Sequence, residues 1–168
     1  MPAPYHSLHR KLENVLKAYL AKQADLDATV YTFLECVALG TAVEEPFIGI
    51  RCKRSTPTTD VQLALATGSR VLSAELSIRS HALHVGEPAN ALQVVKTFRE
   101  VHDELVGKTL DCFFTDTLMA DLNTLCAVEN GLEIEQIEQF DMTDEPEERS
   151  GVTQVTIPIT CHPKEWIT

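Results

Sequence analysis

The chain has 168 residues, a length typical of one domain whose hydrophobic core needs no disulfide or metal to fold. Acidic residues outnumber basic ones by 25 to 14, and the resulting net charge of −11 argues against tight binding to nucleic acid or anionic membranes. No apolar run approaches the ~20 residues of a membrane-spanning helix, and five scattered cysteines without a CxxC pair predict buried, reduced thiols. We therefore expect a soluble protein that folds in the cytoplasm.

The first third of the sequence predicts a helix followed by two strands. Apolar residues at helical spacing predict an amphipathic leading helix over 7–23. β-Branched and aromatic residues predict a strand over 28–36, then a connecting loop over 37–45 and a second strand over 47–53. Serines, threonines and a proline predict a surface loop or wide hairpin connection over 54–60.

The clearest alternation in the chain covers residues 71–82, which predicts a strand with one buried face and one wet face. The apolar face consists of Leu72, Ala74, Leu76 and Ile78. The opposite face, which we expect to meet water or another subunit, carries Ser73, Glu75, Ser77 and Arg79.

The second half predicts two helices and two further strands. A helix is expected over 88–106, with Pro88 in its first turn and Gly107 at its end, and Asp116 is expected to cap a shorter helix. Strands are predicted over 132–140 and 152–161. The buried stripe of the longer helix is expected to be Ala91, Val94, Val95, Phe98, Val101 and Leu105.

This order of elements predicts an α+β fold, with a mainly antiparallel sheet of four to five strands and two to three helices packed on one face. We expect a single domain over 1–168, made of the leading helix 7–23, a sheet-and-helix core over 28–161 and a short tail over 162–168. Pro158 predicts that the last strand lies at an edge of the sheet or carries a bulge, because proline cannot donate to a strand ladder.

The sequence contains no motif for catalysis, metal binding or nucleotide binding. HExxH, GxSxG, GxxxxGK[ST], GxGxxG and a Cys/His cluster are all missing from it. A small enzyme could still assemble its site from His102 and Cys112, but Cys112 neighbours two phenylalanines, which is typical of the core, and His102 is expected at the surface. We expect no enzyme, cofactor or metal site.

Two charged groups are candidate contact surfaces. The compact basic group is Arg51, Lys53 and Arg54, which either faces water or pairs with acidic groups of a neighbouring subunit. Glu75 and Arg79, on the wet face of the strand over 71–82, are further candidate contact residues. The acidic segment 141–151 predicts a hairpin loop that is solvated, contacts a basic surface of a partner, or holds a cation, although it lacks the pattern of a calcium loop. Its carboxylates are Asp141, Asp144, Glu145, Glu147 and Glu148.

Taken together, the layout resembles the tail terminator, or tail-to-head joining, proteins of long-tailed bacteriophages. The resemblance covers residues 7–163 and rests on the leading helix and on the segments EEPFIGIRC, VLSAELSIRSHA, ALQVVKTFREVHDELVGKTL, TDTLMADLN and GVTQVTIPITCHP. It implies a structural virion protein of the tail–neck region, assembled in the host cytoplasm. Such a protein forms a ring, usually of six subunits, that caps the tail tube.

The resemblance also implies the partners, which are other copies of the chain, the tail tube protein and the head or neck connector protein. DNA would pass through the bore of the ring without specific binding, and no membrane is involved. The family has no catalytic residues to transfer to this sequence. Two alternatives remain open: a head-completion or neck protein, and a non-catalytic adaptor or chaperone-like binding module that holds one partner through the same strand face.

Overall fold

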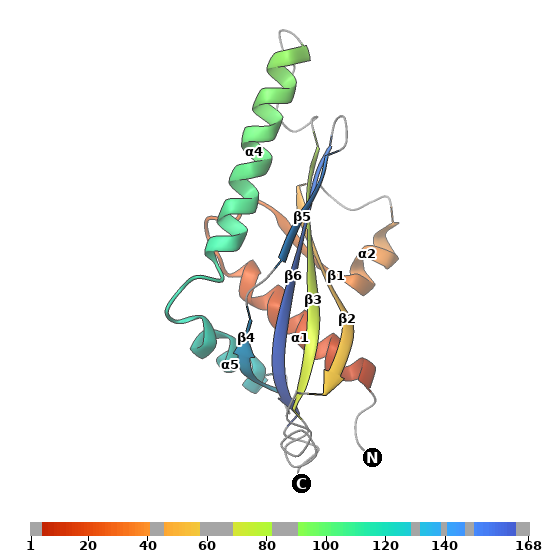
Figure 1. The fold of residues 1–168 in the computed structure, drawn as a ribbon, viewed down its shortest axis with the longest axis vertical. Helices are drawn as coiled ribbons and strands as arrows, with labels where there is room; N and C mark the ends of the chain where they lie inside the picture. Colours follow the sequence, from red (N-terminus) through yellow and green to blue (C-terminus); the bar gives the residue numbers. More distant parts are fainter. Residues whose placement is uncertain are drawn as a thin grey trace.

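A computed structural model describes residues 5–40, 46–57, 69–81, 91–128, 132–138, 141–146 and 150–163. Within these ranges, four helices and six strands form a layered α+β arrangement (Figure 1). The helices are α1 (Tyr5–Ala21), α2 (Phe33–Leu39), α4 (Ala91–Asp111) and α5 (Leu118–Val128). The strands are β1 (Thr29–Thr32), β2 (Phe47–Pro57), β3 (Arg70–His81), β4 (Leu132–Ile137), β5 (Asp141–Pro146) and β6 (Ser150–Pro163).

The sheet is mixed, and its strands follow the order β1-β2-β3-β6-β4, with β5 also pairing with β6. β1 runs parallel to β2, whereas the other pairs are antiparallel. The parallel pair fits the presence of α2 between these two strands, because a parallel neighbour needs a crossover connection. The predicted α+β class is confirmed, but the expected numbers of strands and helices were both too small.

One face of the sheet forms the hydrophobic core with the helices. The predicted leading helix is confirmed as α1, which begins and ends two residues earlier than 7–23 and buries Leu12, Leu16 and Leu20 against the sheet. Burial of each such side chain stabilises the fold by about 1.5–3 kcal/mol. The predicted apolar strand face is also confirmed, since these four residues of β3 are fully buried: Leu72, Ala74, Leu76 and Ile78.

The strand predicted over 28–36 is wrong beyond Thr32, where α2 begins. The Thr32 side chain accepts a hydrogen bond from the Glu35 N–H at 3.4 Å, and the Glu35 carboxylate accepts one from the Thr32 N–H at 2.8 Å. This reciprocal pair is a capping box, which favours a helix start over a continuing strand. Gly40 ends α2 with a positive φ of 54°, a conformation that glycine adopts without steric cost.

The loop expected over 54–60 is a strand in its first part, because β2 continues to Pro57, while 58–60 lie outside the described residues. A bulge between Cys52 and Arg54 shifts the register of β2 against β3. At this bulge the Cys52 N–H donates a hydrogen bond of 2.8 Å to the buried carboxylate of Glu13. Glu13 therefore ties α1 to β2.

Two expectations for the long helix are wrong. α4 continues through Gly107 to Asp111, and a Cβ at Gly107 would meet nothing within 4 Å, so its surroundings do not force a turn there. Leu105 is buried as expected, but Val101 is exposed and His102 is buried. The helix is rotated relative to the expected stripe because His102 bonds to two strands of the sheet.

The last strand is central, so the edge position expected from Pro158 is wrong. The alternative, a bulge at Pro158, is also wrong, because β6 pairs with β3 without a register shift. β6 pairs with β3 along one side, and on its other side β4 ends opposite Ile159 while β5 begins opposite Thr156. Pro158 lies between these two neighbours, and its carbonyl accepts the Glu138 N–H at 3.0 Å. Its missing N–H is tolerated because β3 pairs with Pro158 on one side, and among the described residues no strand pairs with it on the other.

Candidate interaction surface

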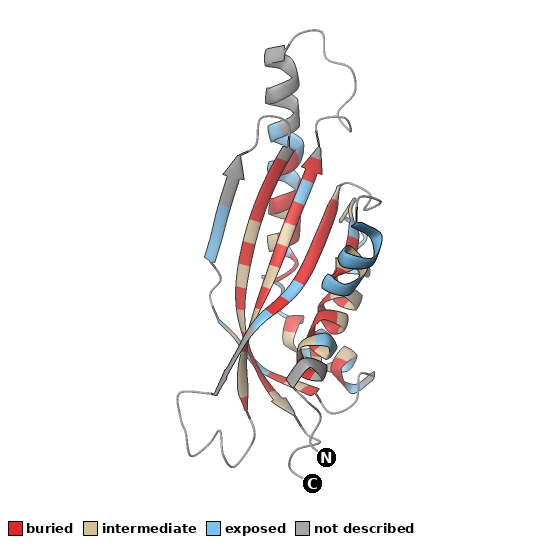
Figure 2. Cartoon of the chain, turned by 90° about the vertical axis from the view of Figure 1, so that its right-hand side faces the viewer, coloured by how far each residue is buried: buried red, intermediate tan, exposed pale blue. Residues whose placement is uncertain are grey.

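The two faces of the sheet differ in what covers them. α1, α4 and α5 pack on the core face, and among the described helices only α2 approaches the other face, from the β1–β2 side (Figure 2). Side chains such as Ser77 and Gln154 on this second face are half-buried rather than buried. We call it the open face, defined by Gly49, Arg51, Ser77, Arg79 and Gln154.

A groove of about 450 Å³ lies on the open face beside α2. Gly49 forms part of its floor, where an added Cβ would lie 3.5 Å from the Phe47 ring and 3.7 Å from the Cys36 Sγ. The groove thus has an aromatic and thiol-lined end next to α2 and a polar end over β3 and β6. Its lining residues are Phe33, Cys36, Gly40, Phe47, Gly49, Ile50, Arg51, Glu75, Ser77, Arg79 and Gln154.

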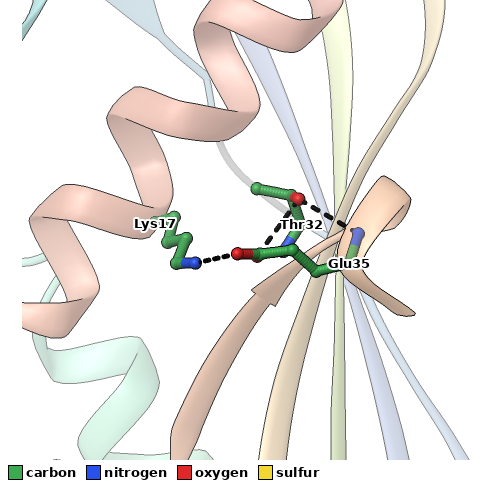
Figure 3. Close-up of polar contacts among 3 residues, drawn as sticks. All are labelled: Lys17, Thr32 and Glu35. Atoms are coloured by element: carbon green, nitrogen blue, oxygen red, sulfur yellow. Dashed lines mark hydrogen bonds and ion pairs between the residues drawn. The ribbon is translucent and has the colours of Figure 1, made fainter. Parts of the chain in front are cut away.

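Polar contacts with α1 and with the end of β1 hold α2 in place. Lys17 of α1 donates a hydrogen bond to the Glu35 carboxylate, which also accepts from Thr32 (Figure 3). The Lys17 hydrogen bond, followed by the Thr32 N–H, lowers the pKa of Glu35 below its usual value. Glu35 therefore stays ionised near neutral pH and joins α1 to the start of α2.

The free side of α2 is apolar. Phe33 is 39% exposed, Leu34 49% and Val37 63%, and none of the residues in α2 is buried. A seven-residue helix with this many exposed apolar side chains gains little from its own packing. Exposed apolar groups gathered in this way are typical of a surface that contacts another protein.

Arg51 and Arg79 of the predicted interface set line the groove. The Arg51 guanidinium lies 4.5 Å from the centre of the Phe33 ring, and that of Arg79 lies 5.9 Å from the Phe47 ring. Both are cation–π contacts, which orient a cation without neutralising it. Among the described residues neither guanidinium has a carboxylate within ion-pair distance.

The basic group predicted from the sequence is not a single cluster. Lys53 forms an ion pair with Glu75, whose side chain also lines the groove, so these two charges cancel within the chain. Arg54 follows the bulge in β2, and its side chain lies outside the described ones. Among the described side chains, the cations available to a partner in the groove are therefore Arg51 and Arg79.

The acidic segment 141–151 is a strand in its first part, and the expectation of a hairpin loop is wrong there. Asp141, with an exposed side chain, Asp144 and Glu145 belong to β5. The side chains of Asp144 and Glu145, and the whole of Glu147 and Glu148, lie outside the described set. In register, Asp141 lies on the same cross-strand row as Arg51, separated by Glu75 and Thr156.

His102, which we expected at the surface, belongs to a buried polar cluster. Its Nδ1 lies 2.6 Å from Ser80 Oγ, and its Nε2 lies 2.9 Å from Thr153 Oγ1. All three residues are buried. A Ser–His pair enclosed in this way fixes α4 on β3 and β6 and is shielded from solvent.

Burial also suppresses the reactivity of the cysteines. Desolvation raises the pKa values of Cys52, Cys112 and Cys161 above that of a free thiol, which disfavours the nucleophilic thiolate. Cys112, considered with His102 as a catalytic pair, instead donates a hydrogen bond of 3.1 Å from Sγ to the Lys108 carbonyl. The predicted burial is confirmed for four cysteines, whereas Cys36 is half-buried in the groove.

Two further features are missing from the described part of the chain. Its helices include none that is both long enough and apolar enough to span a membrane. Its His, Cys, Asp and Glu side chains form no group of three or more that could hold a metal ion.

Comparison with known protein families and with curated proteins found no match. The function must therefore be argued from the residues and their arrangement. Sequence reasoning identified Arg51, Glu75 and Arg79, which the fold brings together in the groove. It missed Phe33 and Cys36, which lie on a helix that was predicted to be a strand and a loop. The Thr-x-x-Glu pattern of residues 32–35 is the signal that could have revealed that helix.

Proposed function

We propose that this protein is a non-catalytic structural protein that forms a ring, and specifically that it caps the tail tube of a long-tailed bacteriophage and joins it to the head or neck connector. The observation that carries the self-association is the groove on the open face beside the exposed apolar side of α2. The phage assignment is supported by the sequence resemblance described above.

The surface has the features of a protein contact site. Its end next to α2 is aromatic and includes Phe33 and Phe47, and it carries two arginines, residue types that are enriched at interfaces. The groove lies on the β1–β2 side of the sheet, whereas β5 pairs with β6 on the far side of β3. Contacts between two different surfaces of identical chains are heterologous, and such contacts close into rings when the rotation between subunits permits.

The net charge of −11 per chain is compatible with a ring through which DNA passes. Negative charge on the bore repels the phosphate backbone and favours passage over binding. Six copies would also repel each other, so their contacts need local pairing of unlike charges. Arg51 and Arg79 provide such charges in an otherwise acidic chain.

The proposal is tested by locating the protein in phage particles made by cells that carry the gene. We expect mass spectrometry of purified particles to detect the chain, and gold-labelled antibody to mark the junction between head and tail. Absence of the chain from the particles would refute the proposal. Labelling on the connector side alone would favour a neck protein, and recovery with one soluble partner would favour an adaptor.

A pair of variants tests whether the α2 surface is required. Leu34→Glu combined with Val37→Glu places charges on exposed positions of α2, and Ala127→Glu does so on an exposed position of α5. We expect both proteins to fold, as judged by circular dichroism. Only the α2 variant should be lost from particles, and its normal incorporation would contradict the role of this surface.

A further inference from the structure

β5 is an edge strand with an apolar side chain in solvent. In the described part of the chain it pairs only with β6. Met142 lies opposite Val155, whose side chain belongs to the core face, yet Met142 remains 50% exposed. Exposed edges are usually blunted by charge or covered by another chain. The sequence of β5, DMTDEP, has three acidic residues and no basic one.

The groove beside α2 has the complementary chemistry. It offers the Phe33 ring, which is partly exposed, and a thioether such as that of Met142 packs favourably against an aromatic ring. It also offers the guanidinium groups of Arg51 and Arg79, which have no carboxylate partner among the described residues. An acidic strand fits this pair of charges, and a basic or neutral one does not.

β5 and the α2 end of the groove cannot meet within one chain. The groove floor at Gly49 and residue Thr143 of β5 lie on one cross-strand row, with Ser77 and Gln154 between them. Three inter-strand spacings separate them by about 14 Å. Any contact between β5 and the α2 end of the groove therefore joins two chains.

We infer that β5 of one copy docks in the α2 groove of a second copy, with Met142 against Phe33 and the acidic strand against Arg51 and Arg79. This inference rests on the proposed self-assembly and names the surfaces that perform it. Because β5 and the groove are different surfaces, the contact repeats from head to tail. The residues on the core-face side of β5 would then lie over the open face of the neighbouring copy.

A native thiol allows a direct test. Cys36 lines the groove, and the other four cysteines are buried. In a Met142→Cys variant, air oxidation should link Cys36 of one copy to the new cysteine of another. Burial, as the largest cause, raises the pKa of Cys36, so the oxidation is run at mildly alkaline pH. We expect a ladder of covalent oligomers, with the link between positions 36 and 142 identified by peptide mass spectrometry.

Control variants separate this contact from chance collisions. Cys36→Ser in the same background should abolish the ladder, and Ala127→Cys on exposed α5 should form no link to Cys36. Arg51→Glu should reduce the yield of the link several-fold, whereas Lys22→Glu, an equal charge change on an exposed lysine, should leave it unchanged. A bridge within one chain is excluded, because a disulfide requires Cα atoms within about 7 Å.

The outcomes distinguish this inference from the function on which it rests. If no link to Cys36 forms, or if only links between two copies of position 142 form, the inference is wrong, even if the protein is found at the head–tail junction. If the link forms and responds to Arg51→Glu, the contact between copies stands, even if the protein is absent from phage particles.

Discussion

The two faces of the sheet differ in how tightly their side chains are packed, although the same strands form both faces. On the core face of β3, Leu76 is fully buried beneath the helices, while its neighbour Ser77 on the open face is half-buried at the groove. Two glycines show the same contrast. A Cβ at Gly151 would lie 2.5 Å from the His102 ring, whereas one at Gly49 would make ordinary contacts at 3.5 Å or more. The core face specifies the fold, and the open face is available for contacts.

The largest expected effect comes from a charge on the core face. Leu76→Asp places an unpaired carboxylate among fully buried side chains, and we expect a loss of several kcal/mol that unfolds the chain. Ser77→Asp, one residue further along the strand, should leave the protein folded. Circular dichroism and chemical denaturation measure both. A folded Leu76→Asp protein would show that the faces have been assigned the wrong way round.

The two glycines give a matched pair with a smaller effect. Gly151→Ala should destabilise the protein by about 1–3 kcal/mol, because the new methyl group displaces the His102 ring, which Ser80 and Thr153 hold in place. Gly49→Ala should change the free energy of unfolding by much less, since its Cβ meets no atom closer than 3.5 Å. Equal effects in denaturation experiments would contradict the contrast between the faces.

Glu13 should make stability depend on pH. Burial, which outweighs the hydrogen bond from the Cys52 N–H, raises the pKa of this carboxyl above 4.5. The folded chain therefore holds this proton more tightly than the unfolded chain. The stabilisation that this proton gives to the folded state is complete below pH 4.5 and is lost as the pH rises through the folded-state pKa.

Two substitutions check this assignment. Glu13→Gln should keep an acceptor for the Cys52 N–H. This variant should become more stable than the original chain as the pH rises above the folded-state pKa of Glu13. Glu13→Ala should cost about 1–2 kcal/mol, because it leaves the Cys52 N–H without its acceptor. Denaturation curves at acidic and neutral pH measure both effects. The same pH dependence in the Glu13→Gln variant would contradict the assignment.

The smallest effect on folding is expected on the open face. Glu75→Ala removes the ion pair with Lys53, which is 46% exposed, so stability should change by no more than about 1 kcal/mol. Loss of this carboxylate makes the groove more positive and should increase the yield of the link between positions 36 and 142. A lower yield would contradict the proposed pairing of an acidic strand with the groove.

The parts of the fold that depend on local patterning were predictable from the sequence. The period-two pattern of β3 and the helical pattern of α1 set which side chains are buried, and both were read correctly. The start of α2 was also readable, because Thr32 and Glu35 have capping-box spacing, but the β-branched residues before it favoured a longer strand.

Other features depend on contacts between distant segments. The burial of His102 depends on Ser80 and Thr153, which lie 22 and 51 residues away. β5 has a sequence of low strand propensity and forms because β6 is long enough to pair with it after β4 ends. The groove could not be predicted for the same reason, since it requires α2 to lie beside β2 and β3.

We propose that this chain acts by associating with its own copies and performs no reaction. Native mass spectrometry of the purified protein over a range of concentrations tests it most directly. We predict assemblies whose masses are whole multiples of 18.6 kDa, with six copies in the closed ring and no additional mass. A chain that stays monomeric at every concentration, or that carries a tightly bound small molecule, would contradict the claim.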